Sequence, residues 1–231
     1  MAAPGLLATT HDPWVRWDWI NRHWSLILSD TRQHLVLTGL AVGMGLVLSA
    51  VLALAARRWR VLEAPILGFA GVVYTIPSLA LFAFLVPWTG LTVTTAEVGL
   101  VGYTLLILVR NIVTGLDGVP EEVKDAARGM GYSPARQLVR VELPLALPAI
   151  VAGIRIAMVT TIGLVTVTAL IGEGGLGALI NDGLSRDFHT PLVVGLAGSV
   201  LLAVAADVLL VGVQRVLSPW AHRRHSAGGA A

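Results

Sequence analysis

The chain has 231 residues, of which 55% are hydrophobic and only 13% are charged, and it contains no cysteine. Soluble domains carry about 25% charged residues, so the polar coat that a water-soluble enzyme needs is missing. The absence of cysteine excludes a secreted disulfide scaffold and a cysteine-based metal site. The net charge of +2 is too small to indicate nucleic-acid binding. We therefore expect an all-α polytopic membrane protein.

Residues 1–34 lack the apolar run of a cleavable signal peptide. Four tryptophans alternate there with charged and polar residues, a pattern typical of a helix lying at the membrane interface. We interpret 1–34 as an interfacial segment that anchors the first span. A docking or substrate-binding role for its aromatic rings stays open. The tryptophans are Trp14, Trp17, Trp19 and Trp24.

Five segments are long and apolar enough to cross a hydrocarbon core about 30 Å thick, which requires about 20 helical residues. The second segment contains Pro77, where we expect a kink. These segments define a transmembrane domain at 35–217, followed by a tail at 218–231. The predicted spans are Leu35–Ala56, Ala64–Pro87, Val98–Leu116, Leu143–Ile171 and Leu192–Val213.

Basic residues lie mostly on one side of these spans. Ten Lys or Arg residues follow the first, third and fifth spans, whereas only four lie before the first span or between the fourth and fifth. The positive-inside rule places the basic side in the cytoplasm. We therefore expect a cytoplasmic C-terminus and an N-terminus outside.

The loop at 117–143 contains signals for two short helices. Pro120 suits the first position of a helix, and Gly131 can adopt the left-handed conformation that ends it. Ser133 is then an N-cap, and Pro134 occupies the first position of the second helix. A sharp turn at Gly131 would expose a flank of small residues, where another protein could approach closely.

The same loop carries a recognisable spacing. An acidic residue and two alanines are followed, after three intervening residues, by a glycine. Nine further residues separate this glycine from a group of the form apolar-x-Leu-Pro. This matches the signature E-A-A-x3-G-x9-I-x-L-P and resembles the membrane-spanning subunits of bacterial ABC importers. Asp replaces Glu at the first position and Val replaces Ile. The motif residues are Asp125, Ala126, Ala127, Gly131, Val141, Leu143 and Pro144.

This resemblance implies that the loop forms a coupling helix seated in a cleft of a separate ATPase subunit. The chain contains no G-x4-G-K-[ST] pattern, so we expect a transport subunit rather than an enzyme. No cofactor is expected here, because the ATPase would bind ATP and Mg. The implied partners are two ATPase subunits, a second permease (the same chain or a similar one) and an extracytoplasmic substrate-binding protein.

Longer stretches resemble the osmoprotectant permeases for glycine betaine, carnitine or choline, within a five-span layout similar to methionine importers. These stretches include residues 74–82, 110–116, 152–155 and 170–177. The resemblance covers nearly all of residues 14–217. An importer of the same architecture for an amino acid or another small polar solute is the first alternative. An ion-coupled secondary transporter is the second, although five dissimilar spans show no inverted repeat.

Two regions are candidates for the substrate pathway. The stretch around the Pro77 kink would form a constriction, with Tyr74, Pro77, Ser78 and Phe82; aromatic faces suit a quaternary ammonium ion, although they also pack in membrane interiors. The glycine run ending the fourth span, with Gly174 and Gly175, is either a flexible outer gate or a plain turn.

Three charges fall inside predicted spans: Arg110, Arg155 and Asp207. A charge near the middle of a membrane helix costs about 2.5–3.5 kcal/mol on insertion scales and needs a partner. All three lie at comparable depth in the cytoplasmic half. We expect Asp207 to pair with Arg155 or Arg110, as a structural tie or as part of a relay.

Overall fold

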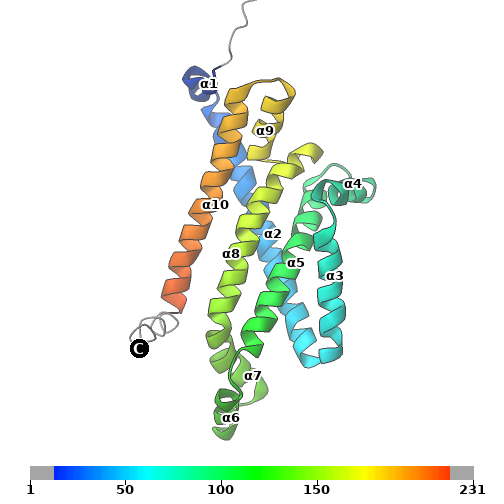
Figure 1. Ribbon diagram of the computed structural model, residues 1–231, viewed down its shortest axis with the longest axis vertical. Helices are drawn as coiled ribbons and strands as arrows, with labels where there is room; N and C mark the ends of the chain where they lie inside the picture. The colour runs from blue at the N-terminus through cyan, green and yellow to red at the C-terminus, as the bar shows by residue number, and fades with distance from the viewer. Residues whose placement is uncertain (1–12, 219–231) are drawn as a thin grey trace, which may run out of the picture.

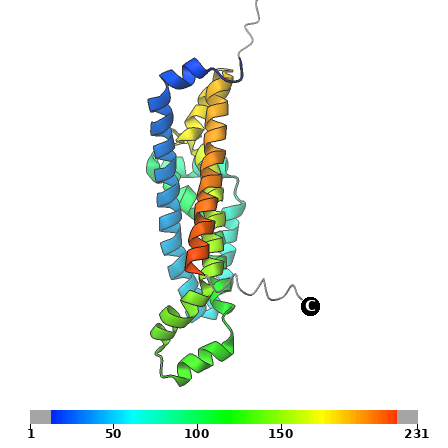
Figure 2. The same ribbon diagram turned by 90° about the vertical axis from the view of Figure 1, so that its left-hand side faces the viewer.

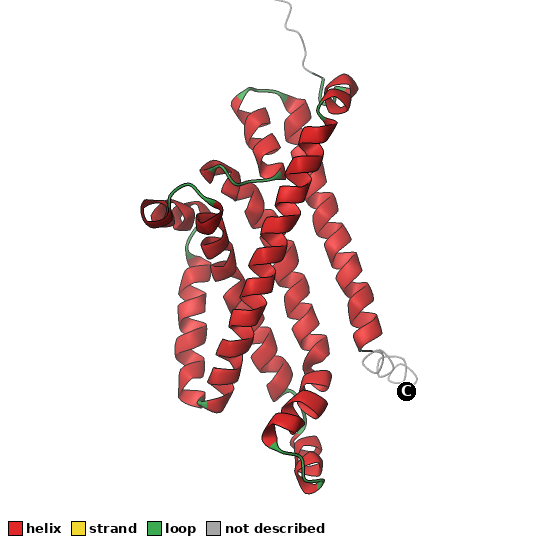
Figure 3. Cartoon of the chain, turned by 180° about the vertical axis from the view of Figure 1, so that it is seen from behind, coloured by secondary structure: helices red, strands yellow, loops and turns green. Residues whose placement is uncertain are grey.

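Residues 13–218 are described by the computed structural model, and all regular secondary structure within this range is helical (Figures 1 and 3). The longer helices run alternately up and down an elongated bundle, whereas α4 (Ser78–Thr89) lies across it (Figure 1). The helices that run along the bundle are α2 (Trp24–Arg58), α3 (Glu63–Thr75), α5 (Val93–Asp117), α8 (Leu143–Thr168) and α10 (His189–Leu217).

Short helices cap both ends of the bundle. At one end lie α1 (Trp17–Arg22) and α9 (Leu176–Ser185), and at the other α6 (Glu121–Gly129) and α7 (Pro134–Gln137) project beyond the bundle (Figure 2). Three tighter or wider turns complete the chain: the 3-10 turns η1 (Arg60–Leu62) and η3 (Ala169–Ile171), and the π-helical turn η2 (Leu138–Glu142).

Four of the predicted spans are single helices long and apolar enough to cross a membrane. The fifth, Ala64–Pro87, is broken: α3 and α4 meet at Pro77 with a bend of 99°. The 13 residues of α3 rise only about 20 Å, short of the hydrocarbon core. The expected kink is therefore a complete interruption. Together the two pieces return the chain to the far side, so the five-span layout holds if the bent pair counts as one span.

The N-terminal segment is divided differently from the prediction. A separate short helix, α1, lies across the end of α2 (Figure 2), and its place at the membrane interface stays a prediction. The long helix α2 begins at Trp24, well before Leu35, so residues 24–34 extend the first span. Residues 1–12 of the predicted interfacial segment, and all but Ser218 of the predicted tail, lie outside the described range.

Small residues let the central helices α2, α5 and α8 approach closely. A Cβ added at Gly45 would lie 2.0 Å from the hydroxyl oxygen of Thr104, and one at Gly153 would lie 2.5 Å from the Cβ of Asn111. A larger side chain at Gly45 would push α2 away from α5, and one at Gly153 would push α8 away from α5. Packing through small residues is a main source of helix association in membranes.

Candidate coupling loop and membrane site

The predicted loop helices exist, and their boundaries follow local chemistry. Pro120 precedes α6 as its N-cap residue, one position earlier than expected, and Glu121 and Glu122 occupy the first turn. Arg128 and Lys124 donate hydrogen bonds that lower the pKa of Glu121. Arg128 also pairs with Asp125, so the acidic residue of the motif is held along the helix surface.

The turn after α6 forms as Gly131 predicts. Gly131 has a φ of +76°. The backbone N–H of Tyr132 donates to the carbonyl of Ala127 at 3.1 Å, and the backbone N–H of Gly131 donates to the carbonyl of Arg128 at 2.9 Å. These two hydrogen bonds make a Schellman motif. Ser133 then caps α7, and Pro134 is its first residue. The sharp turn and both of its signals are confirmed.

Burial divides the motif into two parts. Asp125, Ala126 and Gly131 are exposed, and a Cβ at Gly131 would meet no atom of the described residues within 4 Å beyond its sequence neighbours. Ala127 is buried, and the second group (Val141, Leu143 and Pro144) is half-buried where the loop enters α8. The exposed part is accessible to a partner protein, whereas the other part joins the loop to the bundle.

Glu142, which lies between Val141 and Leu143, was missed by the sequence analysis. Its side chain is only 4% exposed, forms an ion pair with Arg57 at the end of α2, and accepts a hydrogen bond from Gln137 Nε2 at 2.8 Å. It thus ties α2 and α7 to the foot of α8. The sequence offers only a weak signal for this contact. Glu142 occupies the unspecified position of the motif, and Arg57 belongs to the basic residues after the first span, which the positive-inside rule already explains.

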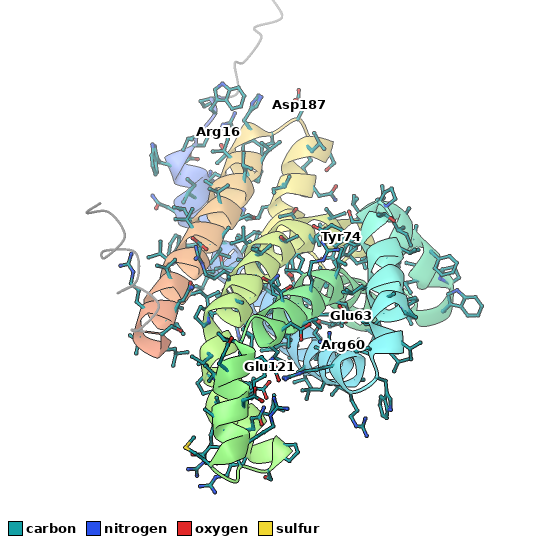
Figure 4. All side chains as sticks on the ribbon, turned by 60° about the horizontal axis from the view of Figure 1, so that its bottom comes forward. Arg16, Arg60, Glu63, Tyr74, Glu121 and Asp187 are labelled. Atoms are coloured by element: carbon teal, nitrogen blue, oxygen red, sulfur yellow. The ribbon has the colours of Figure 1, made fainter. Side chains whose placement is uncertain are left out.

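A second tie lies beside it. Arg60 donates to both carboxylate oxygens of Asp117, at 2.8 and 3.0 Å, and to Glu63 at 3.0 Å. Figure 4 shows Arg60 and Glu63 together at the turn between α2 and α3. The hydrogen bond with Asp117 raises the pKa of Arg60, which stays charged. Both ends of the loop are therefore fixed to the α2–α3 turn region by ion pairs.

At the break in the second span, a distant side chain satisfies the backbone. The hydroxyl of Tyr103 donates to the carbonyl of Ile76, just before Pro77, and the ring of Tyr74 contacts that of Tyr103 edge-on at 6.0 Å. Tyr74 is 38% exposed and Ser78 half-buried, but Phe82 is fully buried in the core beside Leu100. The structure thus does not place Phe82 on an open surface with the other predicted pathway residues.

The glycine run is fastened to α2. Gly175, with a φ of +48°, donates its N–H to Gln33 at 3.2 Å, and Gln33 also donates to Glu173 at 2.9 Å. A Cβ at Gly174 would lie 2.2 Å from the Cβ of Ala169. These contacts describe a tight turn between η3 and α9. A gating role for Gly174 and Gly175 stays a prediction.

The expected intramembrane ion pair forms between α8 and α10. Arg155 donates to both carboxylate oxygens of Asp207, at 2.9 and 3.1 Å, and to Gln214 at 3.4 Å. Arg110 is exposed on α5 and forms no ion pair with any residue in the range 13–218. Asp207 therefore selects Arg155, and the pair borders a groove of about 580 Å³ between the two helices.

Replacing Asp207 with Asn should destabilise the protein by about 2 kcal/mol, because Arg155 would lose its counter-charge within the membrane. Adding Arg155→Leu to that variant should recover part of the loss. Thermal unfolding in detergent measures both variants and the Arg155→Leu single mutant. Strictly additive losses across this double-mutant cycle would contradict the pairing.

No group of three His, Asp or Glu side chains is placed to hold a metal ion in the part of the chain that the structure describes.

Comparison with known proteins agrees with this arrangement. The osmoprotectant import permease protein OsmW of Salmonella typhimurium is 40% identical over 198 residues, covering 84% of this chain and 92% of that protein. The choline transport system permease protein OpuBB of Bacillus subtilis is 35% identical, covering 84% and 89%. The carnitine transport permease protein OpuCB of Listeria monocytogenes is 33% identical, covering 88% and 93%.

Solved structures share the fold. The inward-facing MetNI methionine ABC transporter has a chain with a TM-score of 0.74 at 20% identity, covering 85% of this chain and 98% of that one. A chain of an amino acid ABC transporter solved with histidines has a TM-score of 0.72 at 19% identity, and the match covers 87% of this chain and 98% of that one. Residues 45–223 match the family described as binding-protein-dependent transport system inner membrane component. The chain belongs to this family of multi-pass ABC permease subunits.

Proposed function

We propose that the chain is the permease subunit of an ATP-driven importer that carries quaternary-ammonium osmoprotectants such as glycine betaine, choline or carnitine into the cell. The observation that carries this proposal is the exposed part of the motif, with Asp125 and Ala126 on α6 and Gly131 in the turn that follows, at the end of the bundle. Osmoprotectant, choline and carnitine permeases are 33–40% identical to the chain over most of its length. The two exposed helices α6 and α7 are suited to contact another protein and to pass its movement to the bundle through the contacts of Glu142.

In this proposal the α6–α7 end lies in the cytoplasm and α1 lies outside. Two ATPase subunits would bind ATP and Mg and receive the exposed part of the motif, one on each of two permeases. The second permease is another copy or a similar chain, and a binding protein delivers the substrate from outside. Closure of the ATPase pair would move α6 and α7, and the Glu142 tie would pass that movement to α8 and α2.

An amino-acid importer of the same architecture is the second candidate, favoured by the methionine and amino acid transporters among the structural matches. Those matches share only 19–20% of their residues with this chain, whereas the osmoprotectant relatives share 33–40%. The intramembrane charges that suggested an ion-coupled transporter are partly neutralised by the Arg155–Asp207 pair.

Uptake assays test the proposal directly. Cells lacking their own osmoprotectant importers, supplied with this chain and its neighbouring transport genes, should accumulate labelled glycine betaine, with choline and carnitine competing. In proteoliposomes the uptake should require ATP and persist when ion gradients are collapsed. Uptake that follows an ion gradient, or that prefers an amino acid, would contradict the proposal.

A further inference from the structure

An apolar cavity on the side of the bundle contains a single buried carboxylate. The cavity measures about 810 Å³ and lies between α2, α3, α4 and α5, on the side where α4 crosses the bundle (Figure 3). Glu97, in the second turn of α5, lines it and is only 7% exposed. Glu97 lies just before the predicted span Val98–Leu116 but within the observed helix, which begins at Val93.

Neither carboxylate oxygen of Glu97 has a hydrogen-bond partner within the described residues. Thr94 is the one other polar side chain on the wall, and no basic side chain lines it in the described range. A buried anion without a donor or a cation is costly. The group must therefore hold a proton or face a cation that comes from outside the chain.

The wall chemistry limits what that cation can be. Hard metal ions take six or more oxygen ligands, and this cavity offers three side-chain oxygens at most. A primary ammonium or guanidinium group needs several acceptors, which aliphatic side chains cannot supply. A quaternary ammonium ion donates no hydrogen bonds, and its methyl groups suit apolar walls, with the ring of Phe69 adding a cation–π contact.

The cavity is open to the outside of the chain. Phe69, Met44 and Val98 on its wall are between 45% and 67% exposed. Its volume lies within the range of about 300–1,000 Å³ typical of small-molecule sites. The cavity is therefore large enough to hold a solute the size of choline beside Glu97.

We infer that Glu97 and this cavity form a binding site for a cationic quaternary ammonium solute, which favours choline over zwitterions such as glycine betaine. A zwitterion brings its own carboxylate, which would meet Glu97 without any cation on the wall to balance it. This inference rests on the proposed function for its transport consequence, and the binding site itself can be tested separately.

The transport test compares two solutes in the same cells. Glu97→Gln, which keeps the shape but removes the charge, is expected to lower choline uptake at least tenfold while glycine betaine uptake changes less than twofold. Asp187→Asn is the matched control: it removes an exposed carboxylate from the turn before α10, and Asn tolerates the positive φ there (Figure 4). Unchanged choline uptake, or an equal loss of both solutes, would overturn the inference.

The binding test needs no variant. In the purified, fully assembled transporter, dicyclohexylcarbodiimide should label Glu97, as detected by mass spectrometry of its peptide. Tetramethylammonium chloride should slow this labelling at least tenfold, whereas equal concentrations of sodium chloride or glycine betaine should not. Labelling that tetramethylammonium leaves unchanged would overturn the site. If the wild type imports neither solute, the proposed function fails, and the labelling result alone decides this inference.

Discussion

Replacing Gly131 with Arg is expected to reduce transport below detection while leaving the amount of protein in the membrane unchanged. Two effects act together at this position. A residue other than glycine pays about 1–2 kcal/mol for the left-handed conformation that the φ of +76° requires. The new side chain would also project from the exposed turn, where the proposed ATPase contact lies, because a Cβ there meets no atom of residues 13–218 within 4 Å apart from its own sequence neighbours. Uptake per amount of membrane-inserted protein is the measurement.

A pair of alanine variants separates these effects. Gly131→Ala introduces only the backbone cost and should lower transport partially. Gly129→Ala adds the same methyl group two residues earlier, at a helical position with open space, and should leave transport intact. Normal transport by Gly131→Arg would contradict the coupling role of the turn, whatever the alanine variants do.

The sequence could predict these loop features because they are local. A left-handed glycine, an N-cap serine and a proline at the first helical position act within four residues, so Gly131, Ser133 and Pro134 specify their turn without help from the rest of the chain. The long apolar spans were equally accessible, since length and hydropathy define them.

Features that depend on distant contacts could not be derived. The presence of Pro77 indicates a kink, but the 99° bend also depends on Tyr103, which is 27 residues away, donating to the freed carbonyl of Ile76. The choice of Arg155 over Arg110 depends on how α5, α8 and α10 are rotated about their axes. Glu97 lay outside the predicted span because its charge ended the apolar run, although α5 begins four residues earlier.

Glu142 is the residue whose loss should best separate ATP hydrolysis from transport. Glu142→Ala removes the contacts to Arg57 and Gln137 at once and leaves Arg57, which is only 24% exposed, without its partner. Removing one partner of a buried ion pair lowers the free energy of unfolding by about 3–5 kcal/mol. Because Arg57 is partly exposed, we expect a loss at the lower end of this range for Glu142→Ala. The π-helical turn Leu138–Glu142 would then no longer hold α7 at a fixed angle to α8.

We therefore expect Glu142→Ala to lower uptake at least tenfold while the assembled complex still hydrolyses ATP, since the exposed part of the motif can still reach the ATPase. Glu122→Ala, which removes an exposed carboxylate from the same loop, should transport normally. Adding Arg57→Leu to Glu142→Ala should restore stability, because no unpaired charge remains, but not transport, because the loop is still untied from α2. Restored transport in that double variant would show that charge balance alone matters at the foot of α8, and that the tie does not carry the movement.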